Sequence, residues 1–251
     1  MAAGRPSRVQ VLGLPVDVLT RSSLLDRVAD LVRADGRATV AYLNVHVVNE
    51  AAKDARLRAF LRGVELCYAD GQGIVLGAKL LQQHLPERMT GADWIWDFAA
   101  RAEAQGWRVA WIGGSPGVAR AACDELLARH PGLLLHPEHG FHPSEEQRLL
   151  FERLRDFRPD IVLVGMGTPT QERWVAEHRA SLGAPVVWCL GATADFVSGH
   201  TWRGPAWLHD NAEWLARLVT EPRRLWRRYL LGNPLYLARV LRQRVTGRGL
   251  G

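Results

Sequence analysis

Polar side chains and glycines follow five apolar runs of this sequence, at points where a buried strand would end. Asn44 follows one run, and Asp70 follows the next in the sequence Tyr68-Ala69-Asp70-Gly71. A carboxylate in such a place could take the proton of a sugar hydroxyl as a general base. Asp-Gly is also a common turn dipeptide, so these residues taken alone favour a turn over a catalytic role.

Two glycine-containing loops could bind an anionic ligand. Gly113-Gly114-Ser115-Pro116-Gly117 lies between an expected strand and an expected helix, where backbone N–H groups and the helix dipole favour a phosphate. It is not the GxGxxG fingerprint, and glycines of this kind also make ordinary tight turns. The second loop leads from Gly167 into a helix that begins with Gln171 and Glu172. These two could face a ligand or simply favour the helix start.

The elements that must position these residues form a repeating pattern. Short apolar runs alternate with helical stretches over the first two hundred residues, which predicts an α/β fold with a Rossmann-like, mostly parallel sheet and helices on both faces. We expect strands at residues 8–14, 38–44, 66–69, 108–112, 133–136, 160–165 and 186–191. We expect helices at 22–34, 49–61, 73–83, 93–105, 118–130, 144–157 and 171–181, with Thr90 before the fourth helix and a capping box of Ser144 and Gln147 in the sixth.

Such a sheet places its ligands in one region, beyond the carboxyl ends of its strands. Residues that follow different strands in the sequence should therefore meet there. The predicted site consists of Asn44, Asp70, Gly113, Gly114, Gly167, Gln171 and Asp195.

The sequence gives little indication of a metal site. Its nine histidines form no HxxxH or HExxH spacing, and no two aspartates lie two residues apart, so the DxD motif of metal-bound nucleotide-sugar transferases is missing. Cys67, Cys123 and Cys189 form no CxxC pair, which favours three reduced thiols. We therefore expect neither a metal nor a cofactor.

Positive charge gathers at the C-terminal end. The chain of 251 residues has a net charge of +6, and from Ala216 onward nine arginines accompany a single acid, Glu221. The arginines alternate with Trp226, Tyr229 and leucines. A segment of this kind can lie on an anionic membrane with its apolar side buried, or its aromatic residues can pack on the enzyme itself or on a second subunit. We divide the chain into an α/β core, 1–200, and a Trp/Arg-rich appendage, 201–251.

Hydropathy favours a cytoplasmic protein. The N-terminal residues contain no apolar core of signal-peptide length, and no window reaches the roughly 18–20 apolar residues of a spanning helix. Contact with a membrane would then be peripheral.

Taken together, these residues resemble the WecG/TagA/CpsF family of bacterial glycosyltransferases, glycosyltransferase family 26, over about residues 8–238. The resemblance rests on several motifs in a fixed order: Leu43-Asn44, Asp70-Gly71-x-Gly73, Glu87-Arg88-Met89-Thr90-Gly91-Ala92-Asp93, the loop at Gly113, Gly167-x-Pro169-x-Gln171-Glu172, Gly191…Asp195-Phe196…Gly199, and the tail Glu213-Trp214…Arg217-Leu218…Glu221-Pro222-x-Arg224-Leu225-Trp226-x-Arg228-Tyr229.

The resemblance implies an inverting, metal-independent transferase in cell-surface polysaccharide or teichoic acid synthesis. It would move an N-acetylmannosamine-type sugar, glucose or a uronic acid from a UDP-sugar to an undecaprenyl-diphosphate-linked sugar at the inner face of the bacterial membrane. Asp70 would be the base, with Asn44, Arg88 and Gln171 in the substrate pocket. The residues implied for contact with the membrane or the lipid diphosphate are Arg217, Arg224, Trp226, Arg227 and Arg228.

Departures from the family pattern leave the donor sugar open. Tyr42 stands where a threonine is usual, and Thr170 where a lysine is usual. Whether the working form is a monomer or a homo-oligomer is also open.

Two other functional classes remain as alternatives. A nicotinamide-dependent oxidoreductase that used the Gly113 loop should have an acidic residue near Leu135 to bind the ribose. His136 lies there instead, and Glu138 is the nearest acid. A nucleic-acid-binding module using the arginine tail would leave the polar residues around Asp70 unexplained. We therefore expect no nucleic-acid partner.

Overall fold

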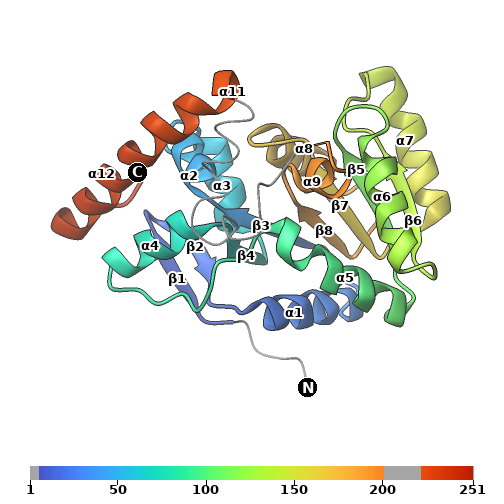
Figure 1. Ribbon diagram of the computed structural model, residues 1–251, viewed down its shortest axis with the longest axis horizontal. Helices are drawn as coiled ribbons and strands as arrows, with labels where there is room; N and C mark the ends of the chain where they lie inside the picture. The colour runs from blue at the N-terminus through green and yellow to red at the C-terminus, as the bar shows by residue number, and fades with distance from the viewer. Residues whose placement is uncertain (1–5, 201–221, 251) are drawn as a thin grey trace.

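The computed structural model describes residues 6–200 and 222–250 (Figure 1). A six-stranded sheet lies at its centre, and every pair of neighbouring strands in it is parallel. The predicted α/β fold with a mostly parallel sheet is therefore confirmed. In spatial order the strands are β4 (Leu66–Ala69), β3 (Ala38–Leu43), β8 (Val186–Cys189), β7 (Ile161–Gly165), β5 (Arg108–Gly113) and β6 (Leu134–Glu138).

The N-terminal apolar run does not join this sheet, so the single strand predicted over residues 8–14 is wrong. It forms an antiparallel hairpin of β1 (Arg8–Val11) and β2 (Leu14–Asp17). The two turn residues, Leu12 and Gly13, have φ angles of 56° and 78°. Positive φ at both central residues is typical of the tight turn that matches strand twist in a hairpin. Since Leu12 is apolar, the sequence pattern hides the reversal.

A buried carboxylate attaches the hairpin to the main sheet. Asp17 accepts hydrogen bonds from Nε and Nη2 of Arg8, each at 2.8 Å, and from the backbone N–H of Cys67 in β4 at 2.6 Å. The paired guanidinium and the backbone donor compensate a charge that would be costly to bury alone.

Helices cover both faces of the sheet, as predicted. One face packs against α1 (Arg21–Arg33), α5 (Gly91–Gln105) and α6 (Val118–Arg129), where Trp94 of α5 stacks on Trp188 of β8 with ring centroids 4.2 Å apart. The other face packs against α7 (Ser144–Phe157) and α8 (Thr170–His178). Because helices bury both faces of the sheet, a ligand can reach the strands only at their ends.

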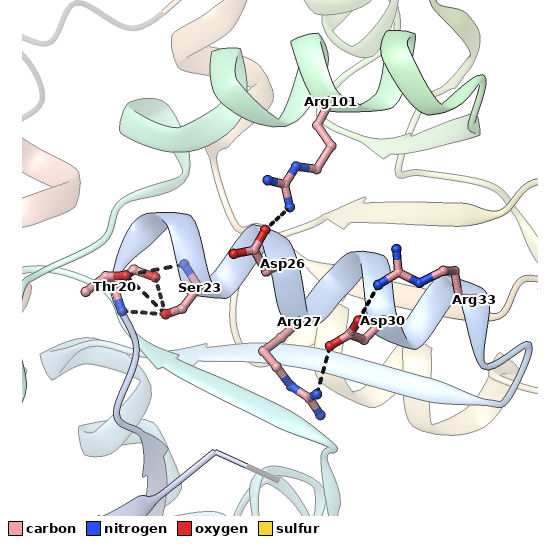
Figure 2. Close-up of polar contacts among 7 residues, drawn as sticks. All are labelled: Thr20, Ser23, Asp26, Arg27, Asp30, Arg33 and Arg101. Atoms are coloured by element: carbon pink, nitrogen blue, oxygen red, sulfur yellow. Dashed lines mark hydrogen bonds and ion pairs between the residues drawn. The ribbon is translucent and has the colours of Figure 1, made fainter. Parts of the chain in front are cut away.

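The first helix shows how local polar contacts set an element. The hydroxyls of Thr20 and Ser23 form a reciprocal capping box at the start of α1 (Figure 2). Farther along α1, Asp26 forms an ion pair with Arg101 of α5. Asp30 pairs with Arg27 and Arg33 on the same helix.

Two helix predictions need correction. The stretch predicted as one helix over 49–61 is two, α2 (Val45–Ala51) and α3 (Ala55–Gly63), because the Asp54 carboxylate accepts the N–H groups of Arg56 and Leu57 and starts a new helix. The predicted capping box of Ser144 and Gln147 is also wrong. Pro143 holds the N-cap position of α7, so Ser144 is already the first helical residue.

The described part of the C-terminal region is helical and packs on the core. It consists of α11 (Pro222–Trp226), a π-helical turn η2 (Arg227–Leu231) and α12 (Gly232–Thr246). In Figure 1 these red helices lie beside α2 and α4 (Gln72–Leu80). Asn49 donates to the Gly232 carbonyl at 2.8 Å, and Gln243 accepts the Leu12 N–H at 2.9 Å. No helix of the described ranges has the length and apolar composition to cross a membrane.

Candidate functional site

A cavity of about 540 Å³ opens at the carboxyl ends of the parallel strands. Its walls come from the segments that follow β3, β4, β5, β6, β7 and β8, with additional residues from α11 and η2. Five residues of the predicted site line it: Asn44, Asp70, Gly114, Gly167 and Asp195. Three others, Arg88, Gly113 and Gln171, are close in sequence to lining residues but are not part of the wall.

Asn44 fixes the orientation of the Asp70 carboxylate. It follows β3 and is the N-cap of α2, where its Oδ1 accepts the Val47 N–H at 2.9 Å. This contact turns the amide nitrogen toward β4, and Nδ2 donates to Oδ2 of Asp70 at 2.9 Å. The Asp70 backbone is held as well, since its N–H donates to the Leu43 carbonyl at 2.8 Å. The carboxylate is thus preorganised at the cavity wall.

Gln171 lies beneath the cavity, not in it. The side chain is fully buried. Its Oε1 accepts the Gly191 N–H at 2.9 Å, and its Nε2 donates to Tyr42 Oη at 3.3 Å and to Glu172 Oε1 at 2.8 Å. Because Tyr42 and Gly191 both line the cavity, we interpret Gln171 as a positioning residue that holds this part of the wall.

Gly113 and Arg88 also act from behind the wall. A Cβ atom on Gly113 would lie 2.4 Å from the carbonyl oxygen of Gly165 on the neighbouring strand, so a larger residue would push β5 and β7 apart. Arg88 pairs with Asp93 at 3.3 Å, with little of either side chain exposed. This pair brackets the short segment 90–92, which lines the cavity.

Arg228 brings positive charge from the C-terminal region to the cavity. It lines the cavity together with Leu225, which is buried. Burial and, after it, the charge of Arg228 lower the pKa of His46 to about 4. His46, which also lines the cavity, is therefore a neutral imidazole at physiological pH and can exchange hydrogen bonds without adding charge.

The other predicted tail residues lie elsewhere. Trp226 and Arg227 are exposed on the outer side, with the Arg227 guanidinium 5.3 Å from the centroid of the Trp226 ring. Arg217 and the side chain of Arg224 are outside the described residues.

Phe141 is a cavity residue that sequence reasoning missed. It is on the segment after β6 and reaches the wall from there. The rule that found the other residues, position after a parallel strand, also applies to it. Its apolar character concealed it, because only polar residues and glycines were considered.

A buried carboxyl near the site gives a stability prediction. Burial raises the pKa of Glu172, whose Oε1 accepts from Thr168 and Gln171 while its Oε2 has no hydrogen-bond partner within the described ranges. The pKa of this carboxyl is therefore higher in the folded protein than its unfolded value of 4.5. Its contribution to folding stability is fully present below pH 4.5 and is lost as the pH rises through the folded-state pKa. We expect Glu172→Gln to be about 1–3 kcal/mol more stable than wild type at pH 8.

Urea unfolding of both proteins at pH 5 and pH 8 measures this difference. The gain should shrink at pH 5, where the wild-type carboxyl is closer to its neutral form. An equal effect at both pH values would mean that the carboxylate charge is not what costs stability.

The cavity, then, combines an oriented carboxylate, two glycine-containing loops and an arginine at the carboxyl edge of a parallel sheet. A comparison with known families agrees with the motifs that surround it. The model of the glycosyl transferase WecG/TagA/CpsF family matches residues 9–249, nearly the whole chain. The protein belongs to the WecG/TagA/CpsF family of glycosyltransferases, whose members act in cell-surface polysaccharide synthesis.

Proposed function

We propose that this protein is an inverting glycosyltransferase that moves a sugar from a UDP-sugar to a sugar on a polyprenyl diphosphate, with Asp70 as the general base. The observation that carries the proposal is the Asp70 carboxylate, held by Asn44 at 2.9 Å and presented to a cavity of about 540 Å³. That volume is within the range of pockets for small-molecule ligands. The donor sugar we favour is of the N-acetylmannosamine type.

The reaction needs one base and in-line attack. The acceptor hydroxyl oxygen forms a bond to the anomeric carbon of the donor while its proton passes to the Asp70 carboxylate. The bond between the anomeric carbon and the UDP oxygen breaks, and its electron pair leaves with UDP. A single displacement of this kind inverts the anomeric configuration. General base catalysis contributes about 10²–10⁴-fold to such steps.

The departing UDP carries negative charge that the protein must stabilise. Gly114 and Ser115 line the cavity just before α6 begins, where backbone N–H groups and the helix dipole favour anions. Arg228 supplies a full positive charge on the same cavity. Fixed dipoles and charges aimed at a leaving group act strongly in a site partly closed to water. These groups support a transfer step that requires no Mg²⁺ or Mn²⁺ on the diphosphate.

The acceptor explains why the C-terminal helices border the cavity. A polyprenyl chain stays in the bilayer, so the enzyme must approach the membrane surface to reach the sugar on it. We propose peripheral binding at the inner face of the bacterial membrane through the outer side of η2 and α12. Leu230 and Leu231 are exposed there, next to Arg227.

The direct test is release of UDP by the purified protein offered a panel of UDP-sugars with a lipid-diphosphate-linked sugar acceptor. We expect release that depends on the acceptor, is greatest for one donor, and does not rise when Mg²⁺ or Mn²⁺ is added. NMR of the product should show the anomeric configuration opposite to that of the donor. A product with retained configuration would contradict the single-displacement mechanism, and absence of UDP release with every pair would contradict the proposed substrates.

A further inference from the structure

A cluster of histidine and glutamate side chains lies where the segment after β6 enters α7, outside the cavity wall. His139, His142 and Glu146 each offer one ligand atom, and these atoms all lie within 4.8 Å of one another. The spacing is HxxH followed by a glutamate four residues later, which differs from the HxxxH and HExxH motifs. We propose that these three residues bind a divalent transition-metal ion, best matched by Zn²⁺, and that the ion fixes this loop.

His142 gives the strongest indication of a missing ligand. Its side chain is only 4% exposed, yet neither ring nitrogen has a hydrogen-bond partner in the described part of the chain. The nearest acidic oxygens are Oε2 of Glu138, 3.7 Å from Nε2, and Oε2 of Glu146, 3.9 Å from Nδ1. Both distances are too long for hydrogen bonds. Buried polar atoms almost always have partners, so something between these groups should satisfy them.

The distances suit a small cation bound between the side chains. Tetrahedral Zn²⁺ with bonds of about 2.0–2.1 Å holds its ligand atoms roughly 3.3–3.4 Å apart. Nδ1 of His142 and Oε2 of Glu146 reach this separation by moving about 0.5 Å closer together. The ring of His139 stacks on that of His142, with centroids 4.0 Å apart and planes 20° apart. A metal lies in the plane of each imidazole that binds it, so the His139 ring must rotate out of this stack for both histidines to bind one ion. Nδ1 of His139 accepts only a long hydrogen bond, 3.3 Å from the Phe141 N–H, which a metal bond at the same nitrogen could replace.

A carboxylate behind His142 completes the arrangement. Glu138 accepts two hydrogen bonds from Arg153, at 2.6 and 3.0 Å, and lies 3.0 Å from Nε2 of His136. These partners hold it facing Nε2 of His142. Histidines that bind metals through one nitrogen commonly donate the other N–H to such a carboxylate. Two imidazoles and one carboxylate form a nitrogen and oxygen set that suits Zn²⁺, with water in the remaining position.

The proposed ion would act on the shape of the cavity without touching the substrate. Phe141, between the two histidines, lines the cavity, and the Gly140 N–H donates to the Gly114 carbonyl at 3.0 Å. The three ligands are not part of the cavity wall. The ion would therefore anchor the loop that carries Phe141 and would be structural. Metal binding at this site does not depend on the proposed transfer reaction, and its test needs no sugar substrate.

The test is metal titration of the full chain after removal of metals with a chelator. We expect one Co²⁺ or Zn²⁺ per chain, with Co²⁺ giving visible absorption bands and Zn²⁺ displacing it. His142→Ala and Glu146→Gln should each weaken binding at least about 10-fold. Hydrogen exchange of residues 139–146 should slow when Zn²⁺ is added to the wild type, and should not change in Glu146→Gln.

Matched variants separate this site from other side chains. Glu145→Gln removes another exposed carboxylate in the same helical turn, and His84→Ala removes an exposed histidine elsewhere. Both should bind like wild type. Since Glu146 is exposed, Glu146→Gln should keep its thermal stability without metal. Binding that is absent in the wild type, or that falls equally in Glu145→Gln and Glu146→Gln, would overturn the proposal and leave water as the partner of His142. One-to-one binding without slower exchange would overturn its role in the loop.

Discussion

Asp70→Asn is expected to lower kcat about 10²–10⁴-fold while changing the affinity for the UDP-sugar only a few-fold. The substitution removes the proton acceptor and keeps the shape of the side chain. The amide oxygen of asparagine at this position can still accept the hydrogen bond that Nδ2 of Asn44 now donates at 2.9 Å. The cavity should therefore keep its geometry. Single-turnover rates with the preferred donor and acceptor, together with UDP-sugar binding by calorimetry, measure the two quantities separately.

Two further aspartates serve as comparisons for this effect. Asp35→Asn removes an exposed carboxylate at a turn with φ of 47°, a conformation that asparagine tolerates, and it should leave the rate unchanged. Asp195→Asn removes a negative charge from the same cavity, and it should act mainly on KM. Equal losses of kcat in Asp70→Asn and Asp195→Asn would mean that the charge of the cavity matters and that Asp70 is not a specific base.

The residues around Asp70 could be predicted because the sheet is parallel. Short apolar runs followed by polar residues or glycine identify strand ends, and all such ends of a parallel sheet meet at one edge. Asn44, Asp70, Gly114, Gly167 and Asp195 line one cavity for this reason. The same pattern cannot tell a residue on the wall from one beneath it. Gln171 and Glu172 also follow a strand, but they lie on helix α8 and point into the interior. There Gln171 donates a hydrogen bond to Glu172.

The hydropathy pattern could not predict contacts between segments that are distant in the sequence. A regular helix through the tail would place Leu225 and Leu230 on nearby faces, but the π-helical turn η2 changes the spacing after Trp226. As a result Leu225 is buried at the cavity and Leu230 is exposed on the outside. The hairpin turn at Leu12 escaped prediction for a related reason. An apolar residue with positive φ leaves no signal in the hydropathy pattern.

We expect the protein to bind the membrane through the outer side of η2 and α12, and we expect a few exposed residues there to account for most of the binding. Leu230 and Leu231 are 55% and 57% exposed, and Leu241 and Val245 of α12 are exposed as well. Tyr236 and Val240 point the other way and are buried against the core. Exposed apolar side chains that lie together often mark a surface that contacts a membrane or another protein. Arg227 and Arg242, both exposed, could contact lipid phosphates beside them.

The double variant Leu230→Gln/Leu231→Gln should bind anionic vesicles about 100-fold more weakly than wild type, since each leucine contributes on the order of 1.5 kcal/mol when it enters the bilayer. Sedimentation with vesicles of phosphatidylglycerol measures this. Leu134→Gln/Leu149→Gln, with similarly exposed leucines on β6 and α7 at the other end of the molecule, should bind like wild type (Figure 1). Because Leu225 and Arg228 line the cavity one helical turn away, the first variant should also lose activity on lipid-linked acceptors and keep it on short soluble ones. Unchanged vesicle binding with a shift from dimer to monomer would instead assign this surface to a subunit contact.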